Sequence, residues 1–301
     1  MSDKPVIAIT VGDPAGIGPE VAARAAADAS VLEVCEPVLY GPPSDAVFVL
    51  GQLSAAAGQA AHDAIVRAVR DAESRTVDAI ATAPVNKEAF RLAGLPWTGH
   101  TDLLAHLTRS AHVAMLFYAD ALKVVLATIH VPLSEVPRVL TRESLEATIE
   151  MTARAMPAFG LGTPRIAVAG LNPHAGEHGL FGREEIDTIA PAVAACRGRG
   201  IAVSGPFPAD TLFTRAARGE FDVVVACYHD QGLIPVKLLA FGQAVNVTIG
   251  LPIVRTSVDH GTAFDIAGRG VADAGSMIAA VRLAAMLARS RRQTGASSRG
   301  R

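Results

Sequence analysis

The sequence predicts an α/β protein whose parallel or mixed sheet is covered by helices on both faces. Short apolar runs that suit buried strands alternate with amphipathic stretches along nearly the whole 301-residue chain. Several runs end in a glycine- or proline-rich turn that carries polar side chains, which is where α/β proteins bind ligands. With 50% hydrophobic and 19% charged residues, the chain can bury a large core in one large or two moderate domains.

The composition argues against nucleic-acid and membrane partners. The formal net charge is -2, and Lys and Arg form no stripe outside the carboxyl-terminal tail. No apolar run reaches the ~20 residues that cross a bilayer, and the amino terminus lacks a signal-peptide pattern. Three cysteines without CxxC spacing suggest buried thiols, so we expect a cytoplasmic protein.

The amino-terminal part begins with an apolar strand at 5–11 that runs into the glycine-rich turn 12–18. This turn lacks the G-x-G-x-x-G pattern of dinucleotide-binding folds, because Val21 stands at the third glycine position. Its backbone N–H groups suit a ligand, although tight-turn geometry explains the glycines equally well. The next expected elements are a strand at 36–41, a helix at 54–74 and a strand at 77–81.

Two loops that follow carry candidate ligand groups. Asn86 and Lys87 come directly after the strand at 77–81, where a ligand loop and a plain strand-to-helix connection explain them equally well. Further on, Gly99 turns the chain, and we expect Thr101 to cap a helix and leave His100 in the preceding loop.

The rest of the chain continues the alternation. Thr141 and Ser144 mark the start of an amphipathic helix that extends to Phe159. The polar, basic tail from about Ala288 is expected to be disordered. The other expected elements are a helix at 184–197 and strands at 113–118, 122–128, 165–171, 201–206, 221–228 and 244–249.

Three histidines, His130, His174 and His229, each follow an apolar strand. Imidazoles at strand ends can converge on one divalent cation and leave a position open for substrate, although this spacing matches no short metal motif. Each histidine taken alone is more often a structural or surface residue. Asp210 or Asp230 could add an oxygen ligand or orient a histidine.

The stretch 228–262 holds the densest group of polar side chains. Lys237, Asn246 and Arg255 suit a phosphate or carboxylate, because Arg offers a planar fork of donors and Lys a mobile charge. A solvated face is the alternative, but such charges are costly among buried strands. If these residues share a pocket with a metal, the substrate is a small anion with an alcohol or carboxylate that binds the cation.

The chain resembles the 4-hydroxythreonine-4-phosphate dehydrogenase family over residues 6 to about 287, and nine collinear motifs carry the resemblance. They are GDPAGIGPE (12–20), APVNKE (83–88), TGHTD (98–102), ATIHVPL (127–133), GLNPHAGE (170–177), PADTLF (208–213), YHDQGLIPVK (228–237), VNVTIGLP (245–252) and RTSVDHGTAFDIAGRG (255–270).

The resemblance implies an isocitrate and isopropylmalate dehydrogenase-like fold, with two α/β domains and the active site in the cleft between them. Residues 1–128 and 248–301 are expected to form the first domain, and residues 129–247 the second. The resemblance also implies a homodimer whose active site is shared between the subunits.

The same resemblance implies roles for single residues but assigns none to the dinucleotide. Metal ligands are expected at His130, His174 and His229, one of them contributed across the dimer. Substrate-binding residues are expected at His100, Thr101, Lys237, Asn246 and Arg255, and catalytic support from Asp210 and Lys237.

The implied cofactors are NAD or NADP and a divalent metal such as Zn, Mg or Co. The implied reaction oxidises 4-phosphooxy-L-threonine to 2-amino-3-oxo-4-phosphooxybutanoate, which decarboxylates to 3-amino-2-oxopropyl phosphate in pyridoxal phosphate biosynthesis. This chemistry agrees with the residues, because a cation that stabilises an alkoxide also stabilises the enolate formed on decarboxylation.

Other substrates and other classes of protein remain open. Relatives of the family oxidise D-threonate or D-erythronate 4-phosphate, or cis-dihydrodiols, and Lys237, Asn246 and Arg255 favour a phosphate without separating an amino acid from a sugar acid. A metal-dependent phosphohydrolase and a non-catalytic phosphometabolite-binding protein are the hypotheses from other classes. The chain also departs from the family between Gly41 and Ser54, where its connection is much shorter but every matched site residue remains.

Overall fold

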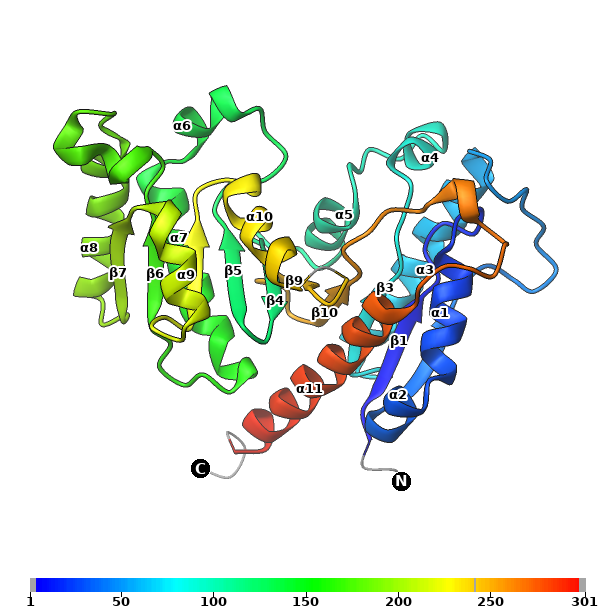
Figure 1. The fold of residues 1–301 in the computed structure, drawn as a ribbon. Coiled ribbons are helices and arrows are strands. Elements are labelled where there is room, and N and C mark those ends of the chain that lie inside the picture. Colours follow the sequence, from blue (N-terminus) through cyan, green and yellow to red (C-terminus); the bar gives the residue numbers. More distant parts are fainter. Residues whose placement is uncertain (1–3, 241, 298–301) are drawn as a thin grey trace. The chain divides into compact units, whose positions relative to one another are not determined.

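A computed structural model gives the fold and describes residues 4–240 and 242–297 (Figure 1). The chain divides into two units, one made of Met1–Val113 and Val245–Arg301 and the other of Ala114–Ala244. Strands alternate with helices in both units, which confirms the predicted α/β class. Among the described helices, none is both long and apolar enough to span a membrane.

The sheet of the first unit has the strand order β2-β1-β3-β10-β9. Neighbouring strands are parallel except for the β10–β9 pair, which is antiparallel. Because the parallel strands point the same way, the residues that follow β1, β3 and β10 lie at one edge of the sheet. The strands are β1 (Val6–Thr10), β2 (Glu36–Tyr40), β3 (Ala79–Thr82), β9 (Val245–Ile249) and β10 (Val254–Ser257).

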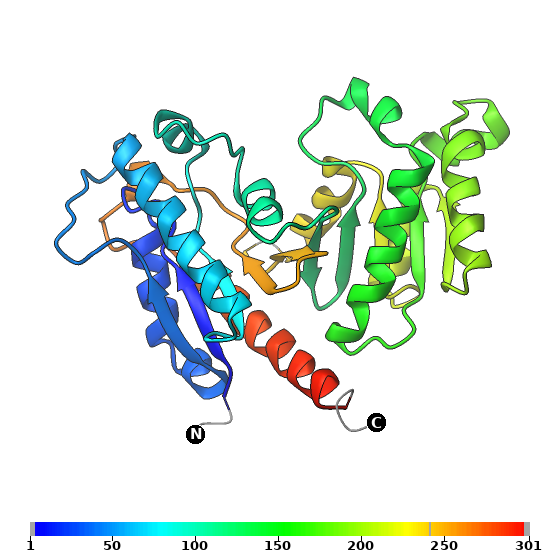
Figure 2. The same ribbon diagram turned by 180° about the vertical axis from the view of Figure 1, so that it is seen from behind.

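Helices cover both faces of this sheet, and alternate residues of β1 show how (Figures 1 and 2). Ile7 and Ile9 pack into one core with three helices, whereas Ala8 packs into a second core on the opposite face. The first core involves α1 (Gly18–Ala27), α2 (Ala29–Val34) and α11 (Gly275–Ser297), and the second α3 (Ala55–Glu73), α4 (Lys87–Leu92) and α5 (His100–Leu107).

The sheet of the second unit has the order β4-β5-β8-β6-β7. An antiparallel β4–β5 hairpin forms one side, and β5, β8, β6 and β7 are parallel. The helices α9 and α10 pack on one face, and Figure 2 shows α7 on the other. The elements are β4 (Ala114–Ala119), β5 (Leu122–Leu126), β6 (Ile166–Ala169), β7 (Val203–Phe207), β8 (Val223–Ala226), α6 (Val136–Val139), α7 (Arg142–Ala155), α8 (Ala190–Gly198), α9 (Ala209–Ala217) and α10 (His229–Ala240).

The division between the units corrects the expected boundaries. The first crossing lies between residues 113 and 114 and not between 128 and 129, because β4 pairs with β5 and β5 pairs with β8. The second crossing lies between 244 and 245, just ahead of the strand β9, and not between 247 and 248.

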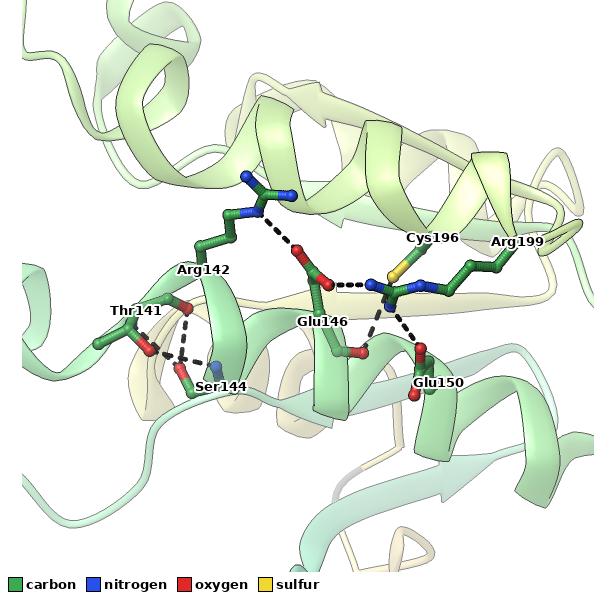
Figure 3. A network of polar contacts seen from close by, with 7 residues as sticks. All are labelled: Thr141, Arg142, Ser144, Glu146, Glu150, Cys196 and Arg199. Atoms are coloured by element: carbon green, nitrogen blue, oxygen red, sulfur yellow. Dashed lines mark hydrogen bonds and ion pairs between the residues drawn. The ribbon is translucent and has the colours of Figure 1, made fainter.

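The start of α7 confirms the predicted helix cap (Figure 3). Thr141 Oγ1 accepts from the backbone N–H of Ser144 at 3.1 Å, and Ser144 Oγ accepts from the backbone N–H of Thr141 at 3.0 Å. One turn on, Glu146 contacts Arg142 of its own helix and Arg199 at the end of α8, at 2.6 Å each. The network therefore ties α7 to α8 on one face of the second sheet.

Two other segments differ from the prediction. No helix was expected directly after β8, but α10 forms there with Pro235 inside it; the cost of this proline is offset by burial of Leu233 and Val236 against the sheet. The tail was expected to be disordered from Ala288, but α11 continues to Ser297, and residues 298–301 lie outside the described part. Cys35, Cys196 and Cys227 are buried free thiols, as predicted.

Candidate functional site

The guanidinium of Arg255 is the most unusual polar group of the first unit. Arg255 lies on β10 and is only 1% exposed. Its Nη1 donates to Thr248 Oγ1 at 2.9 Å and its Nη2 donates to Thr82 Oγ1 at 2.8 Å. These hydroxyls come from strands β9 and β3, so three strands of one sheet position the guanidinium.

No anion among the described residues compensates this charge. Across residues 4–240 and 242–297, Arg255 Nε has no hydrogen-bond partner and no carboxylate forms an ion pair with the guanidinium. Burial alone lowers the pKa of Arg255 to about 9, so the group still carries its charge at neutral pH. A buried, unpaired cation is costly, and an external anion would relieve that cost.

His100 lies in the electrostatic field of Arg255. Burial, and then the charge of Arg255, lower the pKa of His100 well below its usual value, so the imidazole is neutral at pH 7. Its Nε2 has no hydrogen-bond partner in the described part of the chain. A neutral imidazole can donate to a ligand oxygen from this nitrogen, or accept there, depending on the tautomer.

The start of α5 corrects one prediction about this segment. The helix begins at His100 itself, with Gly99 as its first flanking residue, and Thr101 lies in the first turn instead of capping it. No side chain caps this helix; Asp102, in its first turn, instead accepts from the backbone N–H of the preceding Thr98 and, at 2.9 Å, from its hydroxyl. Thr101 is partly exposed, which leaves its hydroxyl available to a ligand.

Asn246 offers a further polar group in the same unit. It lies on β9, next to the strand that carries Arg255, and is partly buried. Its Oδ1 lacks a partner among the described residues. Arg255, His100 and Asn246 therefore each contribute a buried polar atom whose hydrogen-bonding capacity is not used within the described chain, which is the property of a site built for a polar ligand.

In the second unit, His130 and His229 come together after the ends of β5 and β8. Their ring centroids are 5.8 Å apart. His130 has a φ of 46°, in the left-handed region, while His229 is the first residue of α10. His229 Nδ1 lies 2.7 Å from Asp230 Oδ1, so Asp230 is the carboxylate that orients this imidazole.

His174 is held in a loop after β6 and is exposed. Within residues 4–240 and 242–297, no three His, Cys, Asp or Glu side chains are grouped closely enough to hold a metal. The chain thus brings two of the three predicted ligands together, and the third is not part of that pair. Imidazole suits Zn and other first-row divalent ions, so the two rings fit such a metal but do not complete its coordination.

The remaining predicted residues are placed on helices of the second unit. Lys237 lies in α10 and is half-buried, two turns after His229. Asp210 lies in the first turn of α9 and is exposed.

Three contributors were missed by reasoning from the sequence. Thr82 and Thr248 hold the guanidinium of Arg255, and Glu185, 3% exposed, binds the base of the His174 loop. Thr82 ends a strand that was predicted, and Thr248 lies in one of the matched motifs. Their hydrogen bonds to Arg255 could not be predicted, because no local sequence pattern marks a partner so far along the chain. Glu185 stands in a run of charged residues that looks solvent-exposed.

Comparison with known proteins identifies the family of this chain. Residues 12–284 match the family described as pyridoxal phosphate biosynthetic protein PdxA. A 4-hydroxythreonine-4-phosphate dehydrogenase of Desulforapulum autotrophicum is 46% identical over 327 residues, covering 95% of this chain and 96% of that protein. A D-threonate 4-phosphate dehydrogenase of Cupriavidus necator is 45% identical over 329 residues, covering 96% of this chain and 99% of the relative.

Solved structures give the same picture. The crystal structure of 4-hydroxythreonine-4-phosphate dehydrogenase from Klebsiella pneumoniae has a TM-score of 0.87 and 43% identity, covering 95% of this chain and 100% of that one. An isocitrate dehydrogenase from Methylococcus capsulatus, 18% identical with a TM-score of 0.54, shares the fold and so confirms the predicted fold class. On the match over residues 12–284 and these identities, the chain belongs to the PdxA family of pyridoxal phosphate biosynthetic proteins.

Proposed function

We propose that this protein is a dehydrogenase that oxidises a small phosphorylated hydroxy acid with NAD or NADP and a divalent metal. The first candidate substrate is 4-phosphooxy-L-threonine, whose product decarboxylates to 3-amino-2-oxopropyl phosphate for pyridoxal phosphate biosynthesis. The observation that carries the proposal is the buried guanidinium of Arg255, which has a charge and no anion among the described residues. The relatives named for this activity support it.

The first unit supplies the groups that bind the anionic substrate. Arg255 is held by Thr82 and Thr248, so its fork of donors is oriented before substrate arrives and little entropy is lost on binding. Neutral His100 and the amide of Asn246 add polar atoms that can accept or donate without adding charge. We propose that Thr101 and Lys237 are further substrate contacts, with Lys237 or Asp210 moving the proton.

The second unit supplies the metal ligands. His130 and His229 hold the cation, Asp230 orients His229, and His174 is contributed by the other subunit. When bound, the cation polarises the substrate hydroxyl and stabilises negative charge during oxidation and decarboxylation. A homodimer follows from this proposal, because one chain does not group the three histidines within residues 4–240 and 242–297.

The nicotinamide cofactor takes the hydride, and that chemistry belongs to the cofactor. The chain has no dinucleotide glycine fingerprint, so the dinucleotide would be held in the manner of the isocitrate dehydrogenase-like fold. We assign no residue to it. Three buried free thiols are consistent with a reducing, cytoplasmic location for such an enzyme.

The second candidate substrate is D-threonate 4-phosphate or its erythronate isomer. One specific observation favours it: the relative from Cupriavidus necator that carries this name is 45% identical, almost as similar as the relative named for the amino acid. Both substrates have a phosphate for Arg255, and they differ at the carbon that carries an amine or a hydroxyl.

The test is formation of reduced nicotinamide by the purified protein with NAD or NADP, Zn²⁺, Mg²⁺ or Co²⁺, and each of the three phosphates. Turnover with 4-phosphooxy-L-threonine only supports the first candidate, whereas turnover with the sugar acids only supports the second. Arg255→Met should raise KM strongly, and Arg183→Gln, which changes an exposed arginine of the other unit, is the matched control. Absence of turnover with all three substrates would refute the proposal.

A further inference from the structure

Glu185 is a buried carboxylate that the proposed reaction does not use. It is 3% exposed and begins a π-helix, Glu185–Ile189, directly ahead of α8. A π-helical turn inside an α-helical stretch is uncommon and is often found at functional sites. A buried carboxylate needs several hydrogen bonds to offset its desolvation.

All of its partners belong to the start of the loop that carries His174. Oε1 accepts from the backbone N–H groups of Leu171 at 2.8 Å and Asn172 at 2.7 Å. Oε2 accepts from Asn172 Nδ2 at 3.0 Å, and the same amide also donates to Glu184 at 2.6 Å. Glu185 thus binds the two residues that lead into the loop.

The loop itself has a disfavoured backbone. From His174 to His178, five successive residues have positive φ, from 42° to 79°, and only Gly176 among them is a glycine. Residues other than glycine rarely adopt this left-handed backbone conformation, and several such residues in succession are rarer still. Such a conformation persists only where the surroundings hold it.

Glu185 also packs against the middle of this turn. A Cβ placed on Gly176 would lie 2.6 Å from Glu185 Oε2, so the backbone at Gly176 approaches the carboxylate as closely as glycine permits. The carboxylate therefore contacts both the base of the loop and its centre, and His174 lies between these two points in the sequence.

Gln231 connects this loop to the other metal-ligand segment. Its Nε2 donates to the carbonyl of Gly170 at 2.7 Å, and its Oε1 accepts from the backbone N–H of Cys227 at 2.7 Å. Gly170 precedes the residues that Glu185 binds, and Cys227 precedes His229. The buried amide and the buried carboxylate together fix the ends of β6 and β8 relative to one another.

We propose that Glu185 is a positioning residue that holds the left-handed turn 174–178 in the conformation that presents His174 to the divalent cation. This inference rests on the metal assignment of the proposed function. The carboxylate suits the task because one charged group can accept three N–H donors at once, which a neutral amide cannot. Glu185 touches neither the substrate nor the metal.

The test is a titration of the metal-free, full-length protein with Co²⁺, followed by the visible absorption of the bound ion, with Zn²⁺ added in competition. Glu185→Gln should weaken Co²⁺ binding about 10-fold or more, in the range seen when a residue behind a metal ligand is changed, and should alter the Co²⁺ spectrum. Glu185→Ala should have a larger effect. If either variant does not fold, Glu185→Asp, which keeps the charge and withdraws it by one methylene, provides the measurement with a smaller expected loss.

Asp187→Asn is the matched control. Asp187 lies on the same π-helix and pairs with the exposed Arg183 at 2.9 Å, so the variant removes one carboxylate charge without touching the His174 loop. It should leave both affinity and spectrum unchanged. Equal affinities in wild type and Glu185→Gln, or equal losses in Glu185→Gln and Asp187→Asn, would overturn the proposal.

His174→Ala separates the two hypotheses. If this variant loses Co²⁺ affinity and Glu185→Gln does not, only the role of Glu185 is wrong. If His174→Ala binds Co²⁺ as wild type does, the metal assignment of the proposed function is wrong, and the role of Glu185 is overturned with it.

Discussion

Thr82 Oγ1 accepts a hydrogen bond of 2.8 Å from Arg255 Nη2 across 173 residues of sequence. The two residues meet because β3 and β10 are parallel neighbours in the sheet of the first unit. Thr82 is fully buried, so neither group can exchange its partner for water. The arrangement fixes the plane of a guanidinium that has no anion among the described residues. The neighbouring strands of the sheet therefore set the direction in which its N–H groups point.

Thr82→Val should therefore weaken substrate binding as well as stability. The valine keeps the shape but leaves one N–H of a buried cation without an acceptor, which costs about 1–3 kcal/mol of unfolding free energy. KM for the phosphorylated substrate should also rise, because the guanidinium is no longer held in one orientation for the anion; a rise of about 10-fold would correspond to ~1.4 kcal/mol of lost binding free energy. Urea unfolding and steady-state kinetics measure the two effects.

Thr256→Val is the control for that variant. Thr256 is also a fully buried threonine, and its hydroxyl donates to the carbonyl of Ala280 at 2.8 Å without contacting Arg255. It should lose comparable stability with KM unchanged. A similar rise in KM for both variants would show that the effect comes from general loosening of the unit.

The neutral His100 should make the stability of the first unit depend on pH. Its pKa is lowered by burial and then by Arg255, so the unfolded chain takes up a proton at a higher pH than the folded one. The contribution of this residue is therefore fully present above its ordinary pKa of about 6.5 and is lost as the pH falls below that value.

His100→Gln should remove part of this dependence. Between pH 8 and pH 5, the wild type should lose more unfolding free energy than the variant, whereas the exposed His112→Gln should follow the wild type. Urea titrations at both pH values measure the difference. Parallel pH profiles for wild type and His100→Gln would mean that His100 takes up its proton as readily in the folded chain as in the unfolded one.

His229→Ala tests the metal assignment most directly. It removes one of two imidazoles whose centroids are 5.8 Å apart and leaves Asp230 without the ring it orients. Co²⁺ affinity should fall by at least the 10- to 100-fold that is typical even for residues behind a ligand, with the circular dichroism spectrum unchanged. His112→Ala, an exposed histidine of the first unit, is the control. Full activity of the His229 variant would disprove the ligand role.

The strands and loops could be predicted because their signals are local, and the candidate site residues were proposed from the polar side chains at the same strand ends. Apolar runs that end in histidine or glycine mark strand ends, and β1, β5 and β8 lie within a few residues of their predicted ranges. The nine motifs then identified the family, which the comparison confirms. The helix α10 was missed because Gly232 and Pro235 are both typical of turns, and burial of Leu233 and Val236 against the sheet outweighs that preference.

The features that position the site left no comparable signal. The partnership of Arg255 with Thr82 depends on strand order, which local patterns do not encode. Four residues of the left-handed turn are of types that normally avoid positive φ. Gly176 was therefore the one residue of the turn whose type indicated this backbone conformation. Glu185 resembles the half-buried Glu184 and the exposed Asp187 in residue type, and its burial is visible only in the structure. The contacts that orient the candidate ligand-binding side chains thus join residues far apart in the sequence. The candidate side chains themselves were recognised from short local motifs.

The network between α7 and α8 should stabilise the second unit only above the pH at which Glu146 is ionised (Figure 3). Hydrogen bonds from Arg142 and then Arg199 lower the pKa of Glu146 below its usual 4.5. A lowered carboxyl pKa contributes stability that is present above the unfolded value and lost as the pH falls through the folded one. Both arginines are 51% exposed, so salt and solvent screening keep the effect small.

Glu146→Gln should therefore lower the melting temperature by a few degrees at pH 7 and by progressively less as the pH falls toward 3, because the wild type loses this charge as the pH falls through the folded pKa of Glu146. Glu143→Gln, an exposed glutamate on the same helix, is the control and should match the wild type at both pH values. Added salt should reduce the difference at pH 7, because half-exposed ion pairs are screened. A loss of equal size at pH 3 and pH 7 would mean that Glu146 acts through the packing of its side chain and not through its charge.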